Sequence, residues 1–144
     1  MAEYTIREIS DMFQLPSSTL RYYEDMGILT NIDRTASGNR IYKDCHINRL
    51  RTICCFKTAS MSISQLKEFF SYESKEMEHI DDILTLLNLH KTSVTEQLQN
   101  LEKSYVHLLR KLHYYKDIKK SLESNQPLPQ WKDYKFKTFT DDFT

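Results

Sequence analysis

The chain has 144 residues, with 20 Lys and Arg side chains balanced by 20 Asp and Glu side chains. This length suffices for one small domain and one extended element. The balanced charge argues against indiscriminate binding of polyanions, although a local basic face on a neutral protein is enough to bind nucleic acid.

Composition excludes several other classes. Two Gly and three Pro predict a mostly helical protein. No run of about 18 apolar residues is present, so we expect no membrane-spanning helix, and the first residues, MAEYTIREIS, contain no apolar signal region. Three cysteines, two of them adjacent, form a poor disulfide framework and suit a reducing compartment. We therefore expect a cytoplasmic protein with no membrane partner.

Three zones differ in pattern. Residues 1–75 contain short helical segments broken by turn signals, which predicts a small domain. Residues 76–124 form one long periodic stretch without Gly or Pro, and residues 125–144 form an aromatic, charged tail.

The first zone opens with two short helices. Thr5 and Glu8 have the spacing of a capping box, so a helix should begin at Thr5. Pro16 interrupts it, and a second helix restarts at Ser17 and stops before Gly27. Two short helices joined by a tight turn are typical of a helix-turn-helix unit.

Residues 33–43 predict a two-stranded wing, because Ser37-Gly38-Asn39 is a hairpin-type turn. Asp44 is placed to cap a third helix, and Ser62 with Gln65 predicts a capping box that opens a fourth. The expected core side chains of these two helices are Ile47, Leu50, Ile53, Cys54, Ile63, Leu66, Phe69 and Phe70.

From Ile80 to Leu122 the apolar residues recur in steps of four and three, and only Lys91 and Lys119 break the thirteen-position frame. This pattern predicts a coiled-coil helix of roughly 65 Å. A lone helix cannot bury this apolar stripe, which we call the seam, so a homodimer is expected. A folded-back hairpin is the alternative, but residues 80–124 offer no turn. The seam comprises Ile80, Leu84, Leu87, Val94, Leu98, Leu101, Tyr105, Leu108, Leu112, Tyr115 and Leu122.

The first zone resembles the MerR family of bacterial regulators. The resemblance rests on Y4-T5-I6-R7-E8-I9, T19-L20-R21-Y22-Y23-E24, G27-I28-L29 and the wing residues R34 and G38-N39-R40-I41-Y42. It implies an all-α fold with a small β wing, in which a winged helix-turn-helix domain precedes a long antiparallel dimerisation helix, over residues 4–122. Ser60 departs from the family, whose members commonly carry Gly in this turn.

The resemblance also implies a function. Such a homodimer binds double-stranded promoter DNA at a pseudo-palindromic element and acts on RNA polymerase indirectly, by distorting the promoter in response to a small-molecule or thiol-stress signal. Bending DNA costs several kcal/mol, which is offset by contacts made only in the bent form. A coiled-coil adaptor protein without regulatory DNA binding is the alternative. A thiol enzyme ranks lowest, because no side chain is placed by sequence to activate Cys55.

Candidate DNA contacts lie on the second helix, which should enter the major groove. Arg21, Tyr22 and Tyr23 are the first candidates. Alternatively, one tyrosine packs on the first helix and Arg21 pairs with Glu24. Ser17 and Ser18 either contact phosphates or cap the helix.

The wing and the third helix supply further candidates. Arg34, Arg40 and Tyr42 have little core to fill, which favours phosphate or minor-groove contact. Lys57 is either a phosphate ligand or a solvated lysine.

Neither a metal nor a cofactor is expected. No cysteine follows Cys55, and the histidine pairs 79/90 and 107/113 are eleven and six residues apart, so neither pair shares one helical turn.

Cys55 is the candidate thiol sensor, by resemblance of residues 53–63 to the aldehyde- and thiol-stress branch of the family. Cys54 falls on the core stripe and should be buried and inert, whereas Cys55 lies at the edge, where Arg51 and Lys57 would lower its pKa. The competing interpretation is a small buried hydrophobe, and Cys45 is expected to be structural.

The tail contains Trp131, Tyr134, Phe136, Phe139 and Phe143, too many aromatic residues for a typical disordered end. These side chains either roof a pocket near the wing for a small electrophile or hydrophobic effector, or pack on the ends of the coiled coil. The second alternative is favoured.

Overall fold

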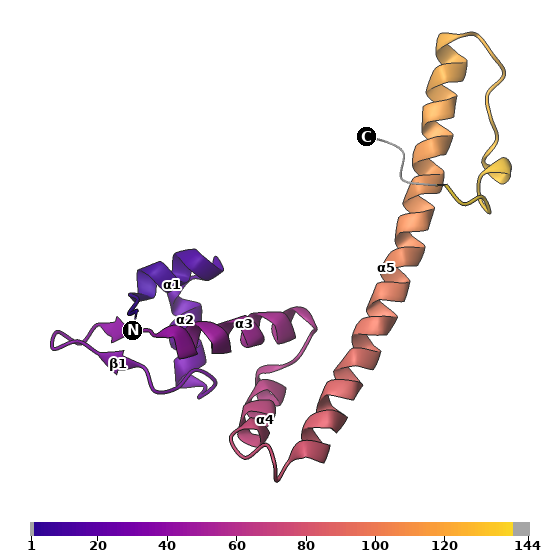
Figure 1. Ribbon diagram of the computed structural model, residues 1–144. Coiled ribbons are helices and arrows are strands. Elements are labelled where there is room, and N and C mark those ends of the chain that lie inside the picture. The colour runs from indigo at the N-terminus through magenta and orange to yellow at the C-terminus, as the bar shows by residue number, and fades with distance from the viewer. Residues whose placement is uncertain (1, 140–144) are drawn as a thin grey trace. The chain divides into compact units, whose positions relative to one another are not determined.

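The computed structural model describes residues 2–139, which are mostly helical (Figure 1). The helices are α1 (Ile6–Phe13), α2 (Ser17–Asp25), α3 (Asp44–Thr58), α4 (Ile63–Glu73) and α5 (Ile80–Glu123). The strands β1 (Asp33–Arg34) and β2 (Arg40–Ile41) form the hairpin, and Trp131–Asp133 form one 3-10 turn. The expected fold class, all-α with a small β wing and a long helix, is confirmed. Two compact units divide between Ser93 and Val94.

Local hydrogen bonds explain where the helices begin. The Glu8 amide donates to Thr5 Oγ1 (3.1 Å) while the Thr5 amide donates to Glu8 Oε1 (3.3 Å), so the capping box that opens α1 is confirmed. The same reciprocal pair joins Ser62 and Gln65 at the start of α4.

The start of α3 differs from the prediction. Asp44 is the first helical residue rather than the cap, and Lys43 holds the cap position. The Lys43 amide donates to Nδ1 of His46 (2.9 Å), so the imidazole one turn into the helix satisfies the amide of the cap residue itself.

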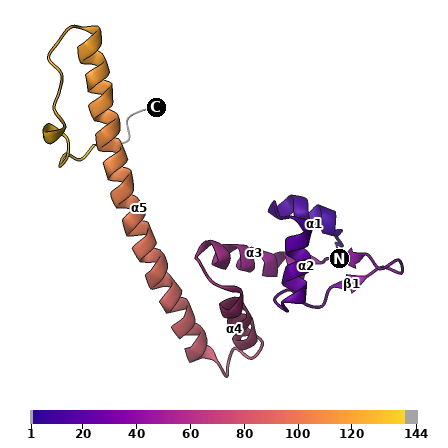
Figure 2. The same cartoon turned by 180° about the vertical axis from the view of Figure 1, so that it is seen from behind.

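The helix-turn-helix and the wing form as expected. Gly27 follows α2 with φ +78°, a left-handed conformation that favours glycine, and the next amide, of Ile28, donates to the Tyr23 carbonyl (3.1 Å). In the hairpin, Asp33 faces Ile41 and Arg34 faces Arg40 in antiparallel register. Figure 1 and Figure 2 show this hairpin beside α1 and α2.

The core of the first unit joins α1 to α4 and the beginning of α5. Ile9 and Leu20, which are fully buried, come from the two short helices, and Phe69 packs edge-on against Phe56 with ring centroids 5.1 Å apart. The other buried side chains include the expected residues of α3 and α4, namely Ile47, Leu50, Ile53, Leu66 and Phe70.

A single helix of 44 residues spans Ile80–Glu123, so the predicted long helix is confirmed and the folded-back hairpin is not what the chain forms. Most of its seam is exposed in the isolated chain: Leu98, Leu101 and Leu108 each leave more than 60% of their surface open, whereas Leu87 packs against the core of the first unit. No helix within residues 2–139 is long and apolar enough to cross a membrane.

The described part of the tail packs on the last turns of α5. Tyr134 donates from its hydroxyl to Asp117 Oδ2 (2.6 Å), and the Trp131 ring lies 5.4 Å from the Tyr114 ring and under Lys111 Nζ (3.8 Å). These contacts agree with packing on the helix end. Phe143 lies outside the described residues.

Candidate nucleic-acid interface

Helix α2 places its two adjacent tyrosines in different environments. Tyr22 leaves 47% of its surface exposed, whereas Tyr23 leaves 6% and packs in the core. Successive helical residues point about 100° apart, and in α2 this rotation turns Tyr23 toward the core while Tyr22 stays on the outer face. Tyr23 is therefore removed from the predicted DNA contacts, and Tyr22 stays among them beside the exposed Arg21.

Glu24 pairs with the wing rather than with Arg21. Arg40 Nε donates to Glu24 Oε1 (2.9 Å), and Arg34 Nη2 lies 3.5 Å from the same oxygen. The side chains of Arg40 and Glu24 are 17% and 22% exposed, so this ion pair is largely shielded from water. One carboxylate thus ties both wing strands to α2.

The wing arginines differ in how much they can offer DNA. Arg34 keeps 48% of its side chain exposed, and its Nη1 donates to the Gly38 carbonyl (3.1 Å), which holds it along the hairpin. Arg40 is mostly covered and its Nε is engaged by Glu24. DNA contact by either arginine stays a prediction.

Tyr42 requires a correction. Its side chain is fully buried, its backbone exchanges two hydrogen bonds of 2.8 Å with Tyr4, and burial raises the pKa of its phenol. The residue was expected on the wing surface, but it follows β2 and pairs with Tyr4 in an antiparallel bridge, and its side chain lies in the core. Tyr42 is a core residue and cannot reach DNA from this position.

The remaining candidates are accessible to different degrees. Pro16 holds the cap position of α2 without a side-chain hydrogen bond, so neither Ser17 nor Ser18 caps the helix. Ser18 is exposed and Ser17 is half-buried at the first turn, where backbone amides favour an anion. Lys57 is exposed in the last turn of α3.

Sequence reasoning missed two side chains that stabilise the first unit. His46 is 3% exposed, and its Nε2 lies 3.0 Å from the Thr30 carbonyl oxygen, which ties α3 to the loop after α2. Arg49 donates from Nε to the Ile28 carbonyl (2.6 Å) and stacks its guanidinium on Phe70 (3.8 Å to the centroid). Neither role has a local sequence signal, because both partners are distant in the chain.

All three thiols are free, and they differ in exposure. Cys55 is exposed, as is Cys45, which was expected to be structural. Cys54 is half-buried and burial raises the pKa of its thiol, which disfavours the reactive thiolate. Over residues 2–139 no three His, Cys, Asp or Glu side chains lie together as metal ligands.

A wing tied to a short exposed helix is the arrangement of a winged helix-turn-helix, and sequence comparison identifies the group. The MerR HTH family of regulatory proteins matches residues 4–73. An HTH-type transcriptional regulator of Haemophilus influenzae is 30% identical over 117 residues, covering 81% of this chain and 86% of that protein. The chain belongs to the MerR family. Members of this family are transcriptional regulators and not enzymes.

One further relative in sequence and one in structure belong to the comparison. The regulator AdhR of Bacillus subtilis is 36% identical over 64 residues, covering 44% of this chain and 46% of that protein. A crystal structure of HiNmlR, described as a MerR family regulator lacking the sensor domain and bound to promoter DNA, has a TM-score of 0.77 at 23% identity, covering 96% of this chain and 100% of that chain. The latter likeness establishes the fold.

Proposed function

We propose that this MerR-family protein is a homodimer that binds promoter DNA sequence-specifically through α2 and the hairpin. The observation that carries the proposal is the exposed face of α2, with Arg21 and Tyr22 pointing outward beside a wing that Glu24 ties to the same helix. A helix and a hairpin held at a constant angle can occupy neighbouring grooves. The promoter-bound state of HiNmlR supports the same use of this fold.

Duplex selection tests the DNA-binding proposal directly. The full-length protein is incubated with a randomised duplex library, and we expect enrichment of a short inverted repeat. Arg21→Ala combined with Arg34→Ala should weaken binding to that repeat by about 10-fold or more, because each half-site loses two charged contacts. Failure to enrich any duplex would instead favour the coiled-coil adaptor.

The seam of α5 supports dimerisation. The tail contacts α5 at residues that include Arg110, Tyr114 and Asp117. With 100° of rotation per residue, these lie on the side of the helix opposite the seam residues Leu108 and Leu112. The tail therefore leaves the seam open to a second α5, which we infer runs antiparallel.

Sedimentation analysis tests the dimer. Leu108→Lys should convert the protein to monomer, because two charges would enter the apolar interface for every dimer formed. Gln99→Lys places the same charge on an exposed residue outside the seam and should leave the dimer intact. A dimeric Leu108→Lys protein would contradict the seam assignment.

We further propose that a small electrophile reacts with Cys55. The modified dimer then distorts the promoter and so presents it to RNA polymerase in a new geometry. The thiolate would add to an aldehyde carbon, and the aldehyde oxygen would take up a proton to give a hemithioacetal. Exposure of Cys55 supports this choice over Cys54. A protein that acts on promoter DNA and keeps its own thiols reduced would work in the cytoplasm.

Transcription from the selected promoter, measured with and without aldehyde, tests the sensor. Cys55→Ser should abolish the response while leaving DNA affinity unchanged. Cys45→Ser removes another exposed thiol and should retain the response. An equal response in both variants would exclude Cys55 as the sensor and favour a hydrophobic effector.

A further inference from the structure

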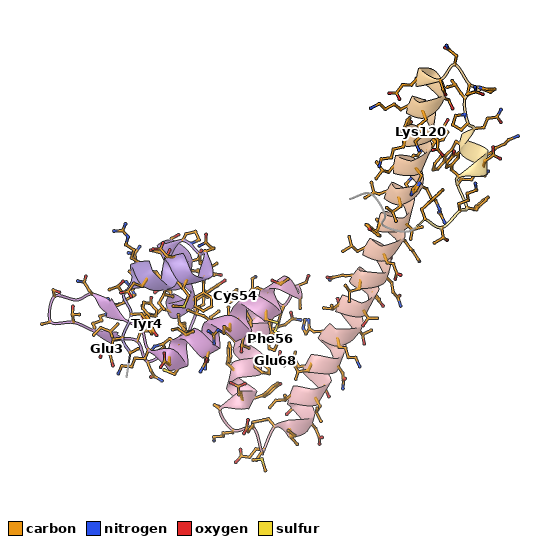
Figure 3. The ribbon with its side chains drawn as sticks, turned by 45° about the horizontal axis from the view of Figure 1, so that its top comes forward. Glu3, Tyr4, Cys54, Phe56, Glu68 and Lys120 are labelled. Carbon is orange, nitrogen blue, oxygen red and sulfur yellow. The ribbon has the colours of Figure 1, made fainter. Side chains whose placement is uncertain are left out.

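A groove of about 460 Å³ lies between the beginning of α1 and the hairpin. We call it the phosphate groove. Side chains from three separate elements meet there, and Figure 3 shows Glu3 and Tyr4, which line it, beside the hairpin. The charged side chains that line it are Glu3, Arg7, Arg21 and Arg40.

The three arginines of the groove are in different electrostatic states. Arg40 is neutralised by Glu24 at 2.9 Å and is largely covered. Arg7 and Arg21 are both exposed, and within residues 2–139 neither guanidinium group forms a hydrogen bond or an ion pair. Two unpaired guanidinium groups therefore face one groove whose wall is held in place by a third, paired one.

The charge of the groove matches one phosphodiester. Arg7 and Arg21 contribute two positive charges and Glu3 contributes one negative charge, which leaves a net charge of about +1 opposite a group that carries −1. Glu8, the next carboxylate along α1, is turned toward the Thr5 backbone and hydroxyl instead. Guanidinium groups offer paired N–H donors that suit phosphate oxygens.

We propose that the phosphate groove holds one backbone phosphate of the operator in each half-site, with Arg7 and Arg21 as its ligands. The inference rests on the proposed DNA-binding function. The Glu3 carboxylate at the groove opposes a free multivalent anion, so the occupant is a phosphodiester held in place by the rest of the DNA contact rather than inorganic phosphate. Arg40 and Glu24 act as positioning residues that keep the wing wall in place.

The test uses the duplex that the wild-type protein selects from a randomised library. Arg7→Gln and Arg21→Gln should each raise the Kd for that duplex by about 10- to 100-fold. The variant that carries both changes should also lower the slope of log K against log salt by about 1.8 per dimer, because the phosphate of each half-site then has no arginine ligand. Arg51→Gln removes an exposed arginine that does not line the groove, so it should change both the Kd and the salt slope less than these variants do.

Neutral methylphosphonate substitutions in the duplex locate the phosphate. One position per half-site should weaken the wild-type protein, weaken Arg7→Gln and Arg21→Gln to a smaller extent, and have no effect on the variant that lacks both arginines. Circular dichroism should show unchanged folding for both variants, because both side chains are exposed.

Three outcomes overturn the proposal. Arg7→Gln could match Arg51→Gln in affinity and salt slope while the wild type binds its duplex tightly, which would overturn this inference alone. Calorimetry could show tight binding of inorganic phosphate with no sensitive methylphosphonate position, which would make the groove a small-anion site. Selection of no duplex by the wild type would overturn the proposed function together with this inference.

Discussion

Replacing Glu24 by Gln tests whether one carboxylate sets the angle of the wing. The change keeps the length of the side chain and leaves an amide oxygen that can still accept from Arg40 Nε, but it removes the charge that attracts both Arg40 and Arg34. The perturbation is therefore confined to the ion pairs that join the hairpin to α2.

The magnitude follows from the distance and the burial. At 2.9 Å and an effective dielectric constant of about 20, the Coulomb attraction is about 6 kcal/mol, and desolvation of both groups cancels most of it. Exposed pairs contribute about 0–1 kcal/mol. Because the side chains here are only 17% and 22% exposed, we expect Glu24→Gln to lower the free energy of unfolding by about 1–2 kcal/mol.

The effect on DNA binding has a sign that distinguishes positioning from simple electrostatics. Removing a negative charge near DNA should strengthen binding to any duplex. If Glu24 orients the wing, binding to the selected operator should instead weaken by about 3- to 10-fold, whereas binding to a scrambled duplex is unchanged or stronger. Fluorescence anisotropy on both duplexes, with urea unfolding at constant protein concentration, measures all three quantities.

Asp25→Asn provides the matched control, because it removes the same charge from the adjacent, exposed position of α2. That variant should bind both duplexes slightly more tightly and retain its stability. A Glu24→Gln protein that behaves like the Asp25→Asn protein would refute a positioning role for Glu24.

Three further predictions follow from other parts of the chain. Ser60 has φ +66° between α3 and α4, so Ser60→Gly should raise the free energy of unfolding by about 0.5–1 kcal/mol in urea, and a loss of stability would contradict this. The hydrogen bond to Asp117 on α5 stabilises the neutral phenol of Tyr134 and raises its pKa from 10.0 to about 12, so this stabilisation is complete below pH 10 and is lost between pH 10 and 12. Trp131 fluorescence of the wild type should therefore change between pH 10 and 12. In Tyr134→Phe, which lacks the hydrogen bond, it should differ from the wild type even at neutral pH. Limited alkylation followed by mass spectrometry should label Cys55 before Cys54, because burial raises the pKa of the latter, and the reverse order would exclude Cys55 as the more reactive of the two.

Local spacing made most of the elements predictable. The Thr5–Glu8 and Ser62–Gln65 pairs lie three residues apart, so the groups that cap each helix are neighbours in the sequence as well as in space. The long helix was equally predictable, since its seam repeats without a turn signal from Ile80 onward. Asp44 was misjudged as the cap because α3 begins one residue earlier than expected, with Lys43 in the cap position and its amide bonded to the His46 imidazole.

The site depended on contacts between residues distant in the sequence. Periodicity could not say which of Tyr22 and Tyr23 would face outward, because that depends on how α2 rotates against α1. Periodicity also could not predict that Glu24 pairs with Arg40 on the wing, sixteen residues away, because helical spacing alone indicated Arg21 as its partner. The sequence by itself determined that this chain contains a helix-turn-helix, a wing and a long helix, because capping, turn and heptad patterns act over a few residues. Tertiary packing alone decided which charged side chains are neutralised within the protein and which remain unpaired, because that depends on where the elements meet.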